Sequence, residues 1–137
     1  MLEVNSSYDS LEEDIPRSAR RILSKLKHEI TVQGNQYLKE LDPQTGYDLF
    51  LFYKECLVNI SRHSVATEFT TKLIGDEKYI LLTVSDNGVG LVEKQNIPSS
   101  LKRRAGLMKA DLKVDSCQNK GTTVELKLPS RKAKKSL

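Results

Sequence analysis

The uninterrupted stretch of residues 47–63 constrains the fold of this chain more than any other part of its sequence. It contains neither proline nor glycine and is long enough for roughly four to five helical turns. At about 100° per residue, its apolar side chains fall within one sector of roughly 120°. These side chains are Leu49, Phe50, Tyr53, Cys56, Leu57 and Ile60. The pattern therefore predicts a long helix that begins near Thr45 and packs one face against the rest of the protein.

Polar side chains of the same stretch gather in a second, narrower sector. Glu55, Asn59 and Arg62 fall within about 60° of one another, because spacings of four and three residues return to the same side of a helix. His63 lies beside them. Two interpretations fit this helix alone: the stripe is either a solvated face on which Glu55 pairs with Arg62 or Asn59, or the edge of a binding site.

The rest of the chain contains short segments of period-two alternation and two further helical segments. Strands are predicted at residues 28–34, 67–75, 78–86, 111–116 and 121–129, and helices at residues 16–26 and 101–110. This order of elements is typical of an α/β two-layer sandwich, in which helices cover one face of a mixed sheet. We therefore expect one domain at residues 16–129, between a flexible acidic segment at residues 1–15 and a disordered basic tail at residues 130–137.

The net charge of +4 comes from the end of the chain. Four of the 22 Lys and Arg residues lie in the tail, which has no acidic residue, so the remaining basic residues balance the 18 acidic ones. A solvated tail explains such a run more often than a nucleic-acid arm does. No apolar run reaches the ~20 residues of a membrane span, and the acidic start does not resemble a secretory signal. We expect a cytoplasmic segment with no nucleic-acid partner and no membrane contact.

The sequence "SDNGVG" at residues 85–90 is a second candidate for a site. Gly88 and Gly90 allow the backbone to approach a ligand closely, and Asp86 at the end of a predicted strand can accept a hydrogen bond from an exocyclic amine. Asn-Gly is also typical of a tight turn. The turn interpretation therefore stands beside the binding interpretation.

Taken in order, the polar stripe, "SDNGVG" and the later "NKGTTVELKLP" resemble the ATP-binding catalytic domain of sensor histidine kinases, in the superfamily that includes gyrase. The resemblance covers residues 30–129 and is closest to the subgroup whose response regulators have helix-turn-helix output domains. It implies a Bergerat-type ATP-binding fold. It also implies histidine protein kinase activity, in which the γ-phosphoryl group of ATP passes to a histidine on a separate dimerisation segment and then to a response regulator. The segment would then be cytoplasmic even within a membrane-bound sensor.

The resemblance also assigns roles to individual residues of the stripe. The N box of the family is a Glu followed by an Asn and then by a Lys/Arg-His pair, which matches Glu55, Asn59, Arg62 and His63. The match implies that Asn59 holds Mg²⁺ between the ATP phosphates. It implies that Glu55, as the catalytic residue, orients metal-bound water, and that Arg62 and His63 lie near the phosphates.

The first glycine box of the family matches Asp86, Gly88 and Gly90. The match implies that Asp86 binds the amino group of adenine. Thr122 or Thr123, in the "KGTT" sequence, is expected to assist through a bound water.

The chain departs from the family at the lid over the phosphates. The subgroup has a Gly-x-Gly-Leu box there, whereas residues 95–98 of this chain are Gln, Asn, Ile and Pro. Glycines let backbone amides wrap the triphosphate, and proline removes one amide donor. Their absence favours a first alternative, a nucleotide-weak protein-interaction module. If Gly106 is instead aligned with a lid glycine, the chain resembles an anti-sigma-factor serine protein kinase, which is the second alternative.

Overall fold

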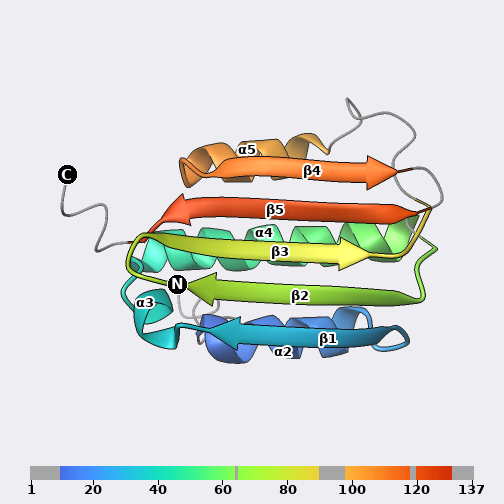
Figure 1. The fold of residues 1–137 in the computed structure, drawn as a ribbon, viewed down its shortest axis with the longest axis horizontal. Helices are drawn as coiled ribbons and strands as arrows, with labels where there is room; N and C mark the ends of the chain where they lie inside the picture. The colour runs from blue at the N-terminus through green and yellow to red at the C-terminus, as the bar shows by residue number, and fades with distance from the viewer. Residues whose placement is uncertain (1–9, 64, 90–97, 118–119, 131–137) are drawn as a thin grey trace.

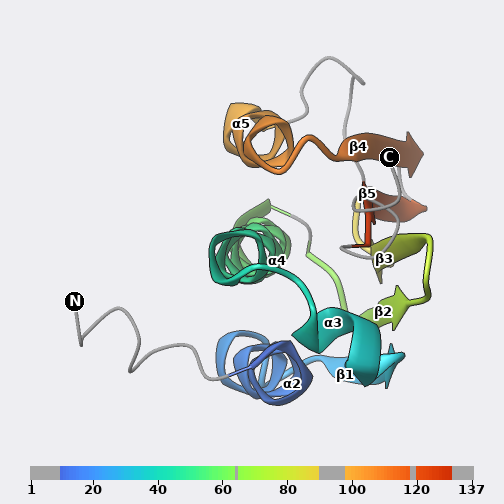
Figure 2. The ribbon, with the colours of Figure 1, turned by 90° about the vertical axis from the view of Figure 1, so that its left-hand side faces the viewer.

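A five-stranded mixed sheet forms one layer of the protein, and helices form the other (Figures 1 and 2). The computed structural model describes residues 10–63, 65–89, 98–117 and 120–130. The strand order is β1-β2-β3-β5-β4, in which β1 and β2 are parallel and the other neighbouring pairs are antiparallel. The predicted α/β sandwich, with helices on one face of a mixed sheet, is therefore confirmed.

The helices and strands follow the predicted order, with one addition. Their bounds are α2 Leu11–Ile22, β1 Lys27–Gln33, α3 Asn35–Lys39, α4 Pro43–His63, β2 Glu68–Gly75, β3 Tyr79–Asp86, α5 Ser99–Leu107, β4 Asp111–Cys117 and β5 Gly121–Pro129. The addition is the short helix α3, which the sequence analysis did not predict. None of the helices in the described ranges is both long enough and apolar enough to cross a membrane.

Helix α4 lies at the centre of the helix layer, between α2 and α5 (Figure 2). The six apolar side chains that the sequence placed on its inner face are all buried. Phe52 is buried as well, although it lies beside the polar stripe on the helical wheel. This flank of α4 is the one that α5 covers, because Glu55 of the stripe bonds to Ser100 of α5. Burial of α4 therefore extends beyond the face that the sequence predicted.

A buried pair of hydroxyl groups joins α4 to the sheet. Tyr53 and Thr71 of β2 are both inaccessible to solvent, and their side-chain oxygens lie 2.7 Å apart. Burial raises the pKa of the Tyr53 phenol above its ordinary value, although the hydrogen bond with Thr71 opposes the change, so the phenol stays protonated. Each hydroxyl thus satisfies the other within an apolar layer. The pair fixes the position of α4 over β2.

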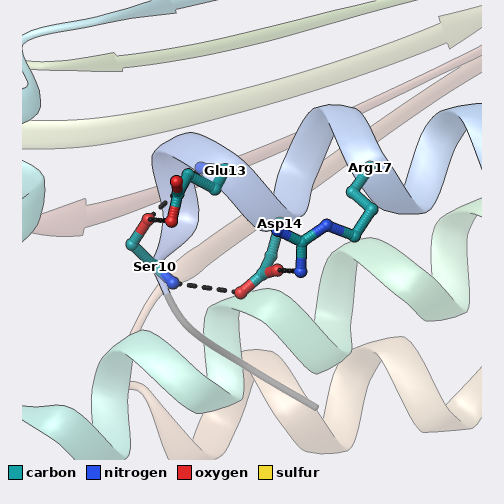
Figure 3. A network of polar contacts seen from close by, with 4 residues as sticks. All are labelled: Ser10, Glu13, Asp14 and Arg17. Carbon is teal, nitrogen blue, oxygen red and sulfur yellow. Dashed lines mark hydrogen bonds and ion pairs between the residues drawn. The ribbon is translucent and has the colours of Figure 1, made fainter. Parts of the chain in front are cut away.

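Helix α2 begins at Leu11 rather than at Pro16, so the predicted start of this helix was wrong. Ser10 caps the helix: its Oγ accepts the backbone N–H of Glu13 at 3.3 Å (Figure 3). The backbone N–H of Ser10 in turn donates to Oδ2 of the buried Asp14 at 3.0 Å. The Ser-x-x-Glu spacing is the sequence signature of a capping box, but here Asp14 rather than Glu13 accepts the N-cap backbone N–H.

The domain boundaries predicted at residues 16 and 129 are too narrow. Leu11 and Ile15 are buried in the core, although they belong to the segment that was expected to be flexible. Ser130 is also buried, and its backbone N–H donates to the carbonyl of Lys78 at 3.0 Å. Residues 1–9 and 131–137, which make up the rest of the two predicted flanking segments, lie outside the described residues.

We expect Asp14→Ala to lower the free energy of unfolding by about 2 kcal/mol. The buried carboxylate accepts the Ser10 backbone N–H and also pairs with Arg17 at 2.7 Å (Figure 3), so its loss leaves donors unsatisfied. Urea denaturation followed by circular dichroism measures the change. Arg20→Ala, at an exposed position of the same helix, is the matched control and should cost less than about 0.5 kcal/mol. Equal losses in the two variants would contradict this account.

Candidate functional site

Asp86 is the last residue of β3 and lies on the face of the sheet that packs against the helices. Leu82 and Val84 precede it at two-residue spacing and are buried on that face. In the strand register Asp86 pairs with Thr122 of β5, and Thr122 pairs with Ser116 of β4. The hydroxyl oxygens of Thr122 and Ser116 lie 2.9 Å apart. Three polar side chains from three strands thus form a row at one end of the inner face.

The register also separates the two threonines that the sequence analysis could not distinguish. Thr123 has its Oγ1 2.9 Å from Oγ of Ser85. Ser85 directly precedes Asp86, and successive side chains of a strand point to opposite faces of the sheet. Thr122 is therefore the threonine that shares a face with Asp86, and Thr123 belongs to the other face.

A cavity of about 370 Å³ opens beside this row. The cavity is lined by residues of both faces of the sheet end: Asp86, Ser116 and Thr122 with Cys117, Lys120 and Gly121, and also Asp115 and Thr123. Its volume lies toward the small end of the range for ligand pockets. Because the lining contains a carboxylate, hydroxyl groups and an amine, a polar ligand meets both hydrogen-bond donors and acceptors there.

The chain bends at Gly88 after β3, and side-chain hydrogen bonds hold this stretch. Oδ1 of Asp86 accepts the backbone N–H of Gly88 at 2.8 Å. Oδ1 of Asn87 accepts the backbone N–H groups of Thr67 and Glu68 at 2.9 and 3.0 Å. The side-chain amide of Asn87 also donates to the hydroxyl of Thr67 at 2.9 Å. The side chain of Asn87 therefore ties this stretch to the start of β2.

Gly121 is a site position that the sequence analysis missed. Its φ is 101°, and a Cβ added there would lie 2.0 Å from the carbonyl oxygen of Asp86. Only glycine permits β5 to begin so close to the end of β3. The signal that could have identified it was a glycine directly before two threonines in "KGTT". Gly90, the second predicted glycine of the box, lies outside the described residues.

The polar stripe lies on α4 as predicted, and Glu55 is tied to α5. Oγ of Ser100 donates to Oε2 of Glu55 at 3.2 Å. Within the described ranges, the hydrogen-bond partner of Glu55 is thus Ser100, and not the Arg62 or Asn59 that a solvated face would require. Arg62 is exposed, and His63 is the last residue of α4. The side chain of His63 lies outside the described part of the structure.

The side-chain amide of Asn59 is buried without a partner. Its Nδ2 forms no hydrogen bond with any residue that the structure describes. A buried donor in this state costs about 1–3 kcal/mol, so it suits a position that a ligand or an ordered water completes. The carboxamide oxygen of Asn59 is a hard ligand of the kind that Mg²⁺ prefers, and the carboxylate of Glu55 one turn earlier can accept hydrogen bonds from water, so the two residues fit the metal that the family resemblance implied. The described residues contain no group of three or more His, Cys, Asp or Glu side chains that could hold a metal ion.

Cys56, which follows Glu55 on α4, does not take part in this chemistry. It is a free cysteine in the core. Burial raises the pKa of its thiol above the ordinary value, and the charge of Glu55 adds to the effect. The thiol therefore stays protonated and is not a nucleophile.

The two parts of the candidate site lie at the same end of the molecule. Figure 1 shows that α4 ends on the side where β3 stops and β5 starts, and Figure 2 shows the helix layer facing the sheet. The end of α4 that follows the polar stripe therefore lies on the same side of the molecule as the end of the sheet that carries Asp86 and Thr122.

The structure tests the alternative alignment in which Gly106 matches a glycine of the lid. The predicted lid residues Gln95, Asn96 and Ile97 lie outside the described residues, and Pro98 directly precedes α5. Gly106 lies within α5 and is exposed. A helical glycine does not match a glycine of a phosphate-binding loop. The structure therefore does not support the alignment that led to the anti-sigma-factor alternative.

Comparison with curated proteins finds sensor proteins, although no family model matches the chain. The sensor protein VraS of Staphylococcus epidermidis is 30% identical over 122 residues, which cover 85% of this chain and 33% of that protein. The sensor protein VraS of Staphylococcus aureus is 32% identical over 89 residues, which cover 61% of this chain and 26% of that protein. The chain thus spans about one third of the length of the first of these relatives.

Comparison with solved structures finds histidine kinases. The blue-light activated histidine kinase of Erythrobacter litoralis EL346 matches with a TM-score of 0.73 and 19% identity, over 93% of this chain and 44% of that chain. The ATP binding domain of PrrB from Mycobacterium tuberculosis matches with a TM-score of 0.67 and 14% identity, over 89% of this chain and 95% of that chain. At these identities the similarity establishes the fold, and it agrees with the predicted fold class.

We expect Gly121→Ala to lower the free energy of unfolding by about 1–3 kcal/mol, because the backbone conformation is left-handed and the added Cβ would overlap the carbonyl of Asp86. Gly106→Ala is the matched control: it is the same substitution on a helix where a Cβ meets no atom within 4 Å, and it should be neutral or stabilising by up to about 1 kcal/mol. Urea denaturation compares the two. A Gly121→Ala variant as stable as the control would show that the close approach of β5 to β3 is not needed.

Proposed function

We propose that the chain, which is similar to curated sensor proteins and has the fold of solved histidine kinase ATP-binding domains, binds ATP with Mg²⁺ and supplies the γ-phosphoryl group for phosphorylation of a histidine. One observation carries the proposal. The C-terminal end of α4, which follows Glu55 and Asn59 in the sequence, lies at the end of the molecule where β3 stops at Asp86, and this supports a shared site. The Asp86–Thr122 row can form hydrogen bonds with a base, and the Glu55–Asn59 stripe can bind phosphates through a metal ion. The two groups therefore match the two ends of a nucleotide.

In the proposal, Asp86 and Thr122 recognise adenine. The carboxylate of Asp86 accepts a hydrogen bond from the exocyclic amine, and the Thr122 hydroxyl contributes directly or through water. The turn supports this role because Gly88 already holds one carboxylate oxygen in place. Gly88 and Gly90 would let the backbone approach the nucleotide closely.

The stripe on α4 would bind the other end of the nucleotide. Asn59 is the proposed metal ligand through its carboxamide oxygen, and Glu55 is the proposed catalytic residue that orients metal-bound water. Mg²⁺ bound there would neutralise charge on the phosphates. Arg62 and His63, at the last turn of α4, would add positive charge or hydrogen-bond donors near the phosphates.

The phosphoryl acceptor and the downstream partner are also proposals, because the chain spans about one third of its curated relatives. We propose that the acceptor is a histidine on a dimerisation segment. The bond between the γ-phosphorus and its bridging oxygen breaks, a bond to an imidazole nitrogen forms, and ADP leaves. The phosphoryl group would then pass to the receiver domain of a response regulator.

A nucleotide-weak interaction module is the second candidate, and one observation favours it. Residues 95 and 97 are Gln and Ile where the family resemblance places glycines. Calorimetric titration with a non-hydrolysable ATP analogue, with and without Mg²⁺, distinguishes the two functions. Binding that Mg²⁺ strengthens supports the kinase domain. Absence of binding at millimolar analogue supports the interaction module.

We expect Asp86→Asn to weaken binding of the ATP analogue by about 1.5–3 kcal/mol, the usual range for a hydrogen bond to a charged group. Asparagine keeps an oxygen for the N–H of Gly88, so the turn should persist. Asp111→Asn is the matched control, because Asp111 is exposed at the start of β4 and does not line the cavity, and it should leave affinity unchanged. Unchanged affinity in Asp86→Asn, measured by calorimetry, would remove Asp86 from the site.

We expect Asn59→Ala to abolish the dependence of nucleotide binding on Mg²⁺ while the fold persists, because Asn59 lies off the apolar face of α4. Gln44→Ala removes an exposed amide at the start of the same helix and should preserve the Mg²⁺ dependence. Calorimetry with and without the metal gives the binding result, and circular dichroism monitors the fold. If Asn59→Ala unfolds the chain, the amide has a structural role instead.

A further inference from the structure

Ser100 of α5 makes its side-chain hydrogen bond to another helix rather than to its own. Ser100 is the second residue of α5 and so lies two positions after the N-cap, from which a serine side chain would cap the free N–H groups of a helix start. The N-cap position is Pro98, and this end of α5 has no side-chain cap. The Oγ of Ser100 instead donates to Oε2 of Glu55 at 3.2 Å, between residues 45 positions apart in the sequence.

The position of Ser100 is fixed by apolar packing next to it. Leu101, Ala105 and Met108 follow along α5 and are all buried in the core. Figure 2 shows α5 directly beside α4 in the helix layer. Because Leu101 adjoins Ser100, the hydroxyl is presented to α4 by a helix that the core already holds in place.

The hydrogen bond orders a side chain that would otherwise be free to move. A Glu side chain has several rotatable bonds, and ordering it costs up to about 2 kcal/mol of rotamer entropy. Glu55 is only half-buried. The Ser100 hydroxyl holds Oε2, and Oε1 takes no part in this bond. Glu55 also lies one helical turn before Asn59, whose buried Nδ2 has no hydrogen-bond partner among the described residues.

We propose that Ser100 is a positioning residue for Glu55: it holds the carboxylate in the orientation that the phosphate end of the nucleotide site requires. The inference rests on the proposed function, because Glu55 needs a fixed orientation only if the stripe binds a nucleotide and its metal. The inference adds α5 to the candidate site, because a side chain of α5 fixes the orientation of Glu55 on α4.

Four variants test the role of the hydroxyl in nucleotide binding. Ser100→Ala and Ser100→Val remove it, Ser100→Thr keeps it, and Ser99→Ala changes an exposed neighbour in the same turn. The dissociation constant of a non-hydrolysable ATP analogue is measured by calorimetry with and without Mg²⁺. We expect Mg²⁺ to lower the dissociation constant of the parent by some factor, and that factor to be about three- to tenfold smaller in the Ala and Val variants. Affinity without Mg²⁺ should stay the same, and the Thr and Ser99 variants should match the parent.

A double substitution checks that Ser100 acts through Glu55. In a Glu55→Ala background the hydroxyl has no carboxylate to orient, so Ser100→Ala should have no further effect on the gain from Mg²⁺. An additional loss in that background would overturn the inference. So would an equal loss of affinity with and without Mg²⁺, which would indicate that Ser100 merely stabilises α5.

The result for the parent chain separates failure of this inference from failure of the proposed function. If the parent does not bind the analogue, the proposed function fails and the inference falls with it. If the parent binds with a gain from Mg²⁺ and the Ala and Val variants keep that gain, only the role of Ser100 is wrong. The Thr and Val variants have nearly the same shape, so their comparison isolates the hydroxyl even if Ser100→Ala alters the packing of α5.

Discussion

Burial of α4 against the sheet and between two flanking helices is the constraint on which the rest of the structure depends. Its inner face supplies much of the core. Tyr53 forms a hydrogen bond with Thr71 of β2, and both side chains are buried away from water. Because this pairing fixes the helix over the sheet, it also fixes where the residues off the inner face end up. The stripe that begins at Glu55 therefore reaches the end of the sheet as a consequence of how the core packs.

At that end, the strand register brings distant residues together. Asp86 and Thr122 are neighbours because β3 and β5 pair antiparallel, and the left-handed Gly121 lets the two backbones approach without a side chain between them. Asn87 then commits its side chain to the start of β2. Asn87 therefore stabilises the fold, whereas the adjacent Asp86 lines the cavity. Substitution of either residue would disturb the candidate site.

Helix α5 links the stability of the helix layer to the candidate site. Leu101 anchors it in the core, and the adjacent Ser100 bonds to Glu55. The buried amide of Asn59, one turn further along α4, has no partner among the described residues. The stripe thus contains Glu55, which is hydrogen-bonded to another helix, and Asn59, whose amide nitrogen is buried without a partner in the described part of the chain. On an ordinary solvated face, side chains form hydrogen bonds with one another or with water. The contrast between Glu55 and Asn59 is the main physical argument for a ligand at this position.

The sequence by itself determined the strands, the long helix, the two-layer architecture and the family resemblance. These follow from local periodicity and short motifs, which need no knowledge of what lies nearby in space. It did not determine the start of α2, because Pro16 suits the first turn of a helix whereas the cap that begins this helix is Ser10, upstream of it. Only the tertiary structure decided that Thr122 rather than Thr123 shares a face with Asp86, and that Glu55 bonds to Ser100 rather than to Arg62. Those outcomes depend on strand register and on packing between helices, which join residues far apart in the chain and leave no pattern in the local sequence.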